Sequence, residues 1–352
     1  MRNLSSTAPS SEPVIASGSV REFFNFYGCT IEIHSSSREL VNEVRRDFSY
    51  FRSAGETPQV RISLYLTAPA YDQLPPVPAS LVTPRNVCFC NESVTYIDYF
   101  GRGLAIYNRQ RRHCDIYGTD PDLVHEIAYL FMLSTVGQHL DAHGMHRLHA
   151  LGVSYRQRGA LLLLPSGGGK STMALRLLRE PEFLLLSEDT PLIDRRGWML
   201  PFPLRLGVRP EQDTAIPPQY LRTIQRMEFD PKTLIDIEYF RDRVGQAVAP
   251  CCILVGERNL GEVSEILPLS RRRVLKALVS NMVVGLGIYQ GMEFLLERGL
   301  WEILGKSGVA TSRFYNSVRL LARAPAYRFI LGRNLDKNYQ TLLTFLRHQG
   351  GN

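Results

Sequence analysis

Hydrophobic and polar positions alternate along the first part of the chain in short segments bounded by turn residues. This period-two pattern predicts half-buried β-strands at 30–34, 59–66, 87–90, 94–99, 104–108 and 113–117. A stretch with helical periodicity, 38–51, lies among them. The last four strands follow one another closely, so we expect an antiparallel sheet.

A second helix is predicted directly after these strands. Asp120 can cap its N-terminus, Pro121 suits its first turn, and apolar residues recur at helical spacing over 124–132. The proline-rich segment 69–84 predicts a surface loop. We therefore expect a smaller N-terminal α+β domain over 19–145 that binds a substrate or a partner.

The pattern changes in the second part, where apolar runs alternate with helix-forming stretches. Short apolar runs at 159–164, 183–186 and 251–255 predict buried strands, and 171–180 predicts a helix. The core face of a final helix is predicted from Tyr339, Leu342, Leu343 and Leu346. This alternation is typical of an α/β domain with a partly parallel sheet, which we place over 146–352.

Composition agrees with two folded domains and adds expectations about location and partners. The chain has 352 residues, of which 44% are hydrophobic, and its formal net charge is +7. The charge favours an anionic partner such as a nucleotide, an acidic peptide or a nucleic acid, and by itself does not choose among them. Residues 1–18 are rich in serine, proline and alanine, which predicts a disordered leader rather than a signal peptide. With no long apolar run and no C-x-x-C pair among six cysteines, we expect a reduced cytoplasmic protein that does not bind membranes.

The strongest chemical motif is a glycine-rich segment, 165–172, which we call the glycine loop. It lies between the predicted strand 159–164 and the predicted helix 171–180, the order found in a phosphate-binding loop of the Walker A type. The predicted nucleotide-binding residues are Ser166, Gly167, Gly168, Gly169, Lys170, Ser171 and Thr172. Lys170 should reach the β- and γ-phosphates of ATP or another nucleoside triphosphate, and the Ser171 hydroxyl should bind Mg²⁺.

The glycine loop departs from the usual pattern at one position. Leu164 stands where the first glycine is expected, so the turn that leaves the strand must differ. The alternative interpretation is a glycine-rich turn with an accidental lysine.

Two adjacent acids, Glu188 and Asp189, follow the next predicted strand. Ligands of open α/β sheets bind at the carboxyl ends of the strands. One carboxylate could hold Mg²⁺ while the other accepts a proton from an attacking hydroxyl, and adjacent residues on an extended chain point to opposite faces. A solvated turn is the alternative.

Other clusters of polar residues are candidates for metal binding or for contact with an anionic partner. Five histidines crowd the segment before the glycine loop: His125, His139, His143, His146 and His149. They lack a cysteine or acid at ligand spacing, so we do not expect a metal cluster, nor one at Cys88 and Cys90. Arg205 and Arg209 could neutralise charge on a transferred phosphoryl group or lie in a solvated loop. The arginines at 271–273 could hold an acidic peptide or a neighbouring subunit, or form a solvated helix face.

With these residues in place, the second half resembles the HPr kinase/phosphorylase superfamily, which is related to phosphoenolpyruvate carboxykinase. It looks closest to the HPr-kinase-like proteins encoded beside ribosomally made peptides such as lasso peptides. The similarity covers about 148–347 and consists of the glycine loop, the acid pair, and a histidine, His149, that precedes a short hairpin leading into the loop. Looser similarities lie at 201–204, 251–255 and 332–335.

The resemblance implies a fold and a set of roles. The fold would be a C-terminal P-loop kinase domain with a mixed sheet of the HPr kinase/carboxykinase type. Asp189 would be the general base, Glu188 and Ser171 would hold Mg²⁺, Lys170 would steady the γ-phosphate, and His149 would form hydrogen bonds near it. The family's habit of assembly implies a homo-oligomer.

These observations lead to two functional hypotheses. The first is an ATP-dependent kinase that phosphorylates a hydroxyl, serine or a terminal residue, on a peptide or small protein. The second is a nucleotide-gated binding or regulatory module, an ATPase or GTPase that transfers no phosphoryl group to a partner. A nucleic acid partner is not expected under either hypothesis.

Overall fold

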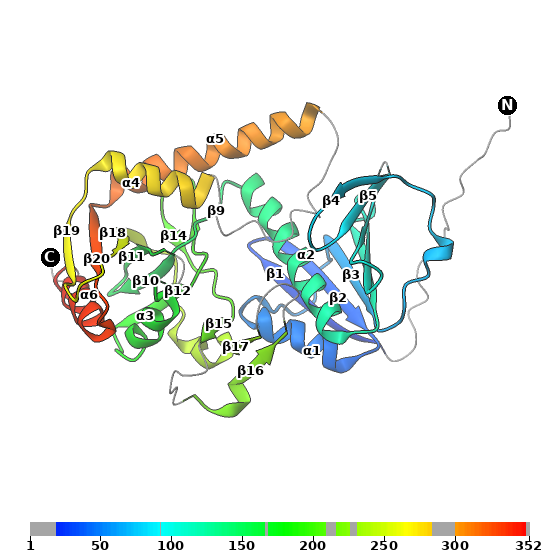
Figure 1. Ribbon diagram of the computed structural model, residues 1–352, viewed down its shortest axis with the longest axis horizontal. Helices are drawn as coiled ribbons and strands as arrows, with labels where there is room; N and C mark the ends of the chain where they lie inside the picture. Colours follow the sequence, from blue (N-terminus) through cyan, green and yellow to red (C-terminus); the bar gives the residue numbers. More distant parts are fainter. Residues whose placement is uncertain are drawn as a thin grey trace.

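The computed structural model describes residues 19–91, 93–165, 168–208, 216–225, 231–283 and 300–349. The predicted leader, 1–18, lies outside the described residues, as do Ser166, Gly167 and Arg209. The chain forms a mixed α/β structure with several sheets, some mixed and some antiparallel. In Figure 1 the N-terminal part, blue to cyan, lies on the right, and the C-terminal part, yellow to red, lies on the left. Among the described residues, no helix has the length and apolar character needed to cross a membrane.

The N-terminal sheet has eight strands in the order β1-β2-β3-β8-β7-β6-β5-β4. Their bounds are β1 (Val20–Phe26), β2 (Cys29–Ser35), β3 (Val60–Tyr65), β4 (Ala79–Val82), β5 (Val87–Asn91), β6 (Val94–Asp98), β7 (Gly103–Asn108) and β8 (His113–Gly118). The successive strands from β4 to β8 pair antiparallel with one another, as predicted for 87–117. The sheet as a whole is mixed, because β3, which lies outside that predicted set, pairs parallel with both β2 and β8. Helix α1 (Arg38–Asp47) carries the chain from β2 to β3, and such a crossover allows parallel pairing.

Three further features of this part differ from what was expected. The segment 69–84 is not wholly a loop, because Ala79–Val82 pairs with β5 as an edge strand, where nearby prolines are tolerated. Strand β1 was not predicted, although order was expected from about residue 20. The helix predicted over 38–51 ends at Asp47 and is followed by a single 3₁₀ turn, Ser49–Phe51.

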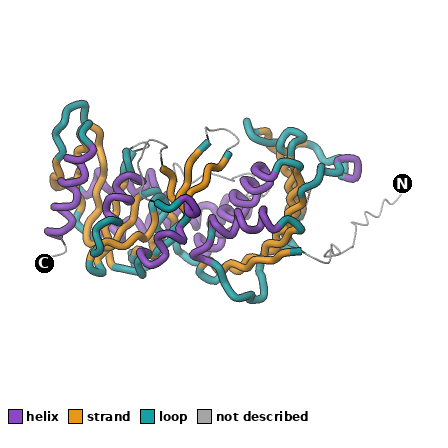
Figure 2. Tube along the Cα trace, turned by 90° about the horizontal axis from the view of Figure 1, so that it is seen from below, coloured by secondary structure: helices purple, strands orange, loops and turns teal. Residues whose placement is uncertain are grey.

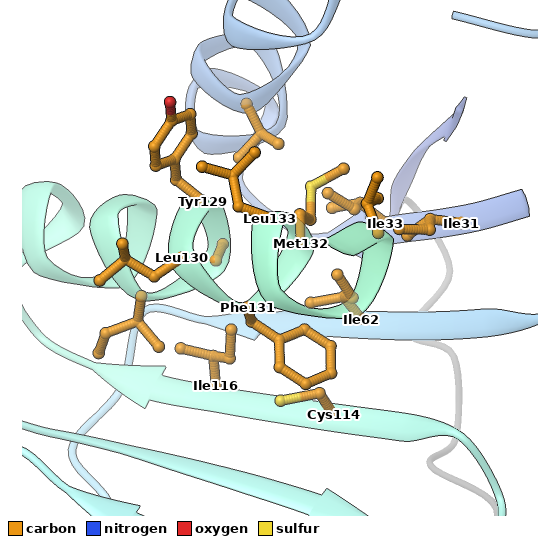
Figure 3. Packing of buried hydrophobic residues seen from close by; sticks show 14 of the residues in the cluster. Ile31, Ile33, Ile62, Cys114, Ile116, Tyr129, Leu130, Phe131, Met132 and Leu133 are labelled. Carbon is orange, nitrogen blue, oxygen red and sulfur yellow. The ribbon is translucent and has the colours of Figure 1, made fainter. Parts of the chain in front are cut away.

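Helices α1 and α2 (Pro121–Ala142) cover one face of the N-terminal sheet. Asp120 caps α2 as predicted, since its side chain accepts hydrogen bonds from the N–H groups of Asp122 and Leu123. Figure 3 shows Phe131 of α2 beside Cys114 of the sheet, in a cluster of buried side chains. Figures 1 and 2 together show these two helices on the side of the sheet that faces the rest of the molecule.

The second large sheet has six strands in the order β12-β10-β11-β18-β20-β19. Their bounds are β10 (Leu151–Tyr155), β11 (Arg158–Leu163), β12 (Phe183–Ser187), β18 (Ala249–Arg258), β19 (Glu265–Pro268) and β20 (Ala326–Leu331). The pairs β11–β18 and β18–β20 are parallel and the others antiparallel, so the expected mixed sheet is confirmed. The strands predicted at 159–164, 183–186 and 251–255 correspond to β11, β12 and β18.

Helices cover both faces of this sheet, which explains why its central strands are apolar without alternation. The remaining helices are α3 (Lys170–Leu177), α4 (Arg271–Leu278), α5 (Leu300–Arg323) and α6 (Leu335–Gln349). From β11, Leu162 packs in one cluster with residues of α3 and α6, whereas Leu161 packs in another with residues of α4 and α5. The predicted core face of the last helix is confirmed, because Leu342 and its partners are buried in α6.

Short elements connect the two large sheets. They form two three-stranded sheets, one of β9 (His146–Arg147), β13 (Leu192–Ile193) and β14 (Met199–Leu200), the other of β15 (Leu206–Val208), β16 (Leu221–Ile224) and β17 (Lys232–Ile235). Single turns or irregular helices occur at Tyr71–Gln73, Pro218–Tyr220, Ile237–Arg243 and Val279–Val283. Leu192 and Phe202 belong to the hydrophobic cluster of the N-terminal sheet, so apolar contacts join the two parts.

Candidate functional site

Three segments predicted to carry chemistry lie along the same edge of the six-stranded sheet, where β11 and β12 end and β10 begins. Strands β11 and β12 run in the same direction, because each pairs antiparallel with β10 between them. The glycine loop follows β11, and Glu188 follows β12 at once. Strand β10 runs the opposite way and begins at that edge, just after His149. The sheet topology therefore brings together three segments that are separated in the sequence.

The described part of the glycine loop has a backbone that requires glycine at two positions. Gly169, the N-cap residue of α3, has φ of +84°, in the left-handed region that favours glycine. A Cβ at Gly168 would lie 2.7 Å from the carbonyl oxygen of Pro165, too close for any other residue without movement. Helix α3 begins at Lys170, and its first N–H groups have no partners within the helix. Because Ser166 and Gly167 lie outside the described residues, their roles stay predictions.

Lys170, His149 and Asp189 converge at the start of α3. The Lys170 Nζ lies 3.0 Å from His149 Nε2 and 3.5 Å from Asp189 Oδ1. The His149 Nδ1 lies 3.2 Å from the same Asp189 oxygen. The Lys170 side chain is 10% exposed and that of Asp189 is 46% exposed. The lysine is thus held inside the site, while the carboxylate is open to an incoming molecule.

Among these three side chains, burial has the largest effect on the protonation of His149. Burial is the main cause that lowers the pKa of His149, and the nearby Lys170 charge acts in the same direction, against the opposing effect of Asp189. The imidazole is therefore neutral at pH 7. Since Nε2 accepts from the lysine ammonium, the ring proton belongs on Nδ1, which faces Asp189.

The second acid, Glu188, has a different partner. The Ser171 hydroxyl donates a hydrogen bond to Glu188 Oε1 at 2.6 Å. Burial raises the pKa of Glu188, and the adjacent Asp189 charge raises it further. The two neighbouring carboxylates thus contact different side chains, as expected on an extended chain.

The donor set of Ser171 and Glu188 fits Mg²⁺. Both atoms are oxygens, which this ion prefers, and nucleotide-bound Mg²⁺ commonly takes only one or two protein ligands, with phosphate oxygens and waters completing its shell. Within the part of the chain that the structure describes, no group of three or more His, Cys, Asp or Glu side chains is arranged to hold a metal ion. The histidines before the loop contact different partners: His125 contacts Asp47, and His146 contacts Asp141 and Ser312.

A cavity of about 190 Å³ lies next to the acid pair, between the two parts of the molecule. Glu188 and Asp189 line one side, and Tyr129 and Leu133 of α2 line the other. The N-terminal part therefore supplies a wall of the cavity that opens on Asp189. Sequence periodicity predicted a helix over 124–132, which includes Tyr129, but gave no sign that this residue faces a cavity.

Arg205 also lines this cavity, but it is not a free loop arginine. Its Nη1 donates to both carboxylate oxygens of Asp47, at 2.9 and 3.0 Å, and its guanidinium lies 3.9 Å from the centre of the Tyr129 ring. Asp47 is fully buried and belongs to α1. The expectation of a solvated loop is wrong for Arg205, because a buried acid from the N-terminal part binds it.

A scan against models of protein families and a search of curated proteins both find no match to this chain.

Proposed function

We propose that the protein is an ATP-dependent kinase that transfers the γ-phosphoryl group of ATP, or of another nucleoside triphosphate, to a hydroxyl group. The expected acceptor is a serine or a terminal residue of a peptide or small protein. The observation that carries the proposal is the convergence of Lys170, His149 and Asp189 where the glycine loop enters α3. A cation that can hold the phosphates and an exposed carboxylate that can accept a proton are two of the parts that phosphoryl transfer uses.

Nucleotide binding would use the backbone of the glycine loop and the Lys170 side chain. Gly168 and Gly169 let the backbone approach the phosphates closely, and the start of α3 favours negative charge. The Lys170 ammonium would exchange its contact with Asp189 for a phosphate oxygen. Asp189 would then be released to act on the acceptor.

Transfer would proceed by displacement at the γ-phosphorus. Asp189 accepts the proton of the acceptor hydroxyl while that oxygen bonds to phosphorus, and the bond to the β–γ bridging oxygen breaks to release the nucleoside diphosphate. The exposure of Asp189 and its place on the cavity wall allow the acceptor to reach it. Ser171 and Glu188 would hold Mg²⁺, which supplies neutralisation of the phosphate charge when bound.

The sequence resemblance supports the same assignment. The histidine before the hairpin, the glycine loop and the acid pair follow the layout of the HPr kinase/phosphorylase superfamily, including its relatives encoded beside ribosomally made peptides. In this proposal Asp189 is the base, and assembly into a homo-oligomer follows the habit of that superfamily.

Two variants test the proposal. Lys170→Ala should abolish binding of MgATP, whereas Asp189→Asn should keep binding and lower phosphoryl transfer by about 10²- to 10⁴-fold, the range expected for loss of a general base. Binding is measured by calorimetry and transfer with γ-labelled ATP and serine-containing peptides. Arg271→Gln, on the exposed face of α4, is the control that should change neither.

The same assay decides against the kinase if its result differs. Normal turnover by Asp189→Asn would remove the assigned base. Label found only as free phosphate would favour the alternative, a nucleotide-gated module without transfer to a partner.

A further inference from the structure

Two cationic side chains that line the cavity, Arg147 and Lys232, form no direct ion pair with a carboxylate among the described residues. The cavity wall also contains two other arginines: Arg205 is paired with Asp47, and Arg85 has an interaction partner as well. Arg147 donates one hydrogen bond, to the Leu133 carbonyl oxygen at 3.2 Å. Lys232 forms no hydrogen bond or direct ion pair with a described residue, but its charge acts on Glu188 and lowers the pKa of that carboxyl against the larger effect of burial. Positive charge beside a cavity costs free energy unless an anion compensates it.

The surrounding backbone makes room for these two side chains. A Cβ at Gly137 of α2 would overlap the guanidinium of Arg147, and a Cβ at Gly207 of β15 would overlap the end of Lys232. Both cations thus lie where a larger residue would displace them. Burial lowers the pKa of Arg147 despite the opposing effect of the Asp141 charge, so the positive charge of the guanidinium is only partly compensated.

The position of the two cations separates them from the phosphate-binding loop. The cavity is lined by Arg147, Lys232 and Asp189, whereas among the described residues Lys170 and His149 do not line it. Asp189 therefore stands between the two regions, with Lys170 on one side and the cavity on the other. An anion held by Arg147 and Lys232 would lie on the acceptor side of the proposed base.

We propose that Arg147 and Lys232 form an anion subsite that selects acceptors carrying a carboxylate or phosphate group close to the hydroxyl that is phosphorylated. This inference rests on the proposed kinase function and adds its substrate class. The small cavity suits one such group and its neighbouring hydroxyl rather than an extended protein surface. Arg147 and Lys232 are specificity residues in this proposal, and neither takes part in the bond exchange.

The test uses two probes that differ only in charge, N-acetyl-L-serine and N-acetyl-L-serinamide. Calorimetry on the full chain with MgADP should show at least about tenfold tighter binding of the acid, because charge-assisted hydrogen bonds are the strong ones. Arg147→Gln and Lys232→Gln should each remove most of this preference. Arg271→Gln removes an exposed arginine outside the cavity and should leave it unchanged.

A further variant separates a built site from general attraction by the net charge. Gly137→Ala keeps every charge but forces the Arg147 guanidinium to move, and alanine suits a helix better than glycine, so the fold should be retained. We expect it to reduce the preference for the acid by several fold. An unchanged preference in this variant and in Lys232→Gln would overturn the proposal.

The source of the anion is tested by replacing MgADP with a non-hydrolysable ATP analogue. Persistent binding of N-acetyl-L-serine supports an acceptor subsite, whereas its displacement by the analogue would assign the two cations to the nucleotide and overturn the proposal. Equal binding of the two probes, or binding of neither, would also overturn it. Binding of MgADP is measured first, so a failure of the proposed function is seen independently of the preference for the acid.

Discussion

Two groups of charged side chains border the same cavity, and they differ in how fully their charges are compensated. One, which we call the interdomain cluster, consists of Asp47, His125, Arg205 and Arg222. The other, which we call the loop cluster, consists of His149, Lys170, Ser171, Glu188 and Asp189. Both combine acids with cations at hydrogen-bond distance. Only in the second does burial shift the pKa of an acid and of a histidine toward their neutral forms.

In the interdomain cluster, several cationic side chains surround the buried acid Asp47. Burial alone would raise the pKa of Asp47, but Arg205, His125 and Arg222 outweigh it, and the net effect is a pKa well below its usual range. Burial acts to lower the pKa of Arg222, and its acidic neighbours reverse this and raise it. Each charge is stabilised by the others, so this cluster holds α1 to the strands of the second part.

The loop cluster shows the opposite balance. Burial, the largest effect on both groups, raises the pKa of Glu188 and lowers the pKa of His149, so each is pushed toward its neutral form. Lys170 divides its contacts between His149 and Asp189. Such under-compensated groups are common where a ligand completes the site. The comparison therefore teaches that contact between opposite charges does not by itself identify function, whereas the direction of the pKa shifts does separate these two clusters.

The largest effect that would test this comparison is expected at the interdomain cluster. Asp47→Asn removes the carboxylate that pairs with the buried Arg205 and one of the three that pair with Arg222, and removal of one partner of a buried pair costs about 3–5 kcal/mol of unfolding free energy. Urea denaturation measures this loss. Glu43→Gln is the matched control, because Glu43 also pairs with Arg222 but its side chain is 40% exposed, and we expect a change below about 1 kcal/mol. Equal effects of the two variants would contradict the distinction.

A smaller effect on stability, with a larger one on binding, is expected at the loop cluster. Glu188→Gln keeps an acceptor for the Ser171 hydroxyl and removes a poorly compensated charge, so the unfolding free energy should stay within about 1 kcal/mol or rise. The same variant should weaken Mg²⁺-dependent ATP binding by at least about tenfold, because it loses an anionic ligand. Denaturation and calorimetry on one preparation separate the two effects. A loss of stability as large as that of Asp47→Asn would place both clusters in the same structural class.

Sequence patterns predicted the loop cluster better than the interdomain cluster, for a physical reason. A phosphate-binding loop is local, so its strand, glycines and helix are readable as one segment, and the edge of the sheet then brings Glu188 to it. Asp47, by contrast, stands at the end of an ordinary amphipathic helix and meets Arg205 and Arg222 only through tertiary folding. No spacing in the sequence signals that pairing.

The same limit explains the errors in the predicted fold. The hairpins from β5 to β8 follow local alternation and were predicted, whereas the parallel pairing of β3 with β2 and β8 depends on how separated segments pack. The cavity was missed because it forms between two parts that periodicity treats separately. Arg147 and Lys232 carry no motif, and their place in the cavity wall emerges only from the folded structure.

The smallest effect is expected in the pH dependence of stability, measured without Mg²⁺ or nucleotide. The folded pKa of Glu188 is raised, so the folded state keeps a proton that the unfolded state releases as the pH rises above the ordinary glutamate value of 4.5. Wild-type protein should therefore lose stability relative to Glu188→Gln as the pH rises from there through the folded pKa. For Asp47, whose folded pKa is lowered, the sign is opposite: its contribution is present above 3.8 and is lost as the pH falls through the folded pKa. Urea denaturation across acidic and neutral pH should thus show the advantage of Glu188→Gln growing toward neutral pH, while the deficit of Asp47→Asn shrinks toward acid. Parallel curves for the two variants would show that both acids are compensated alike, and the contrast between the clusters would fail.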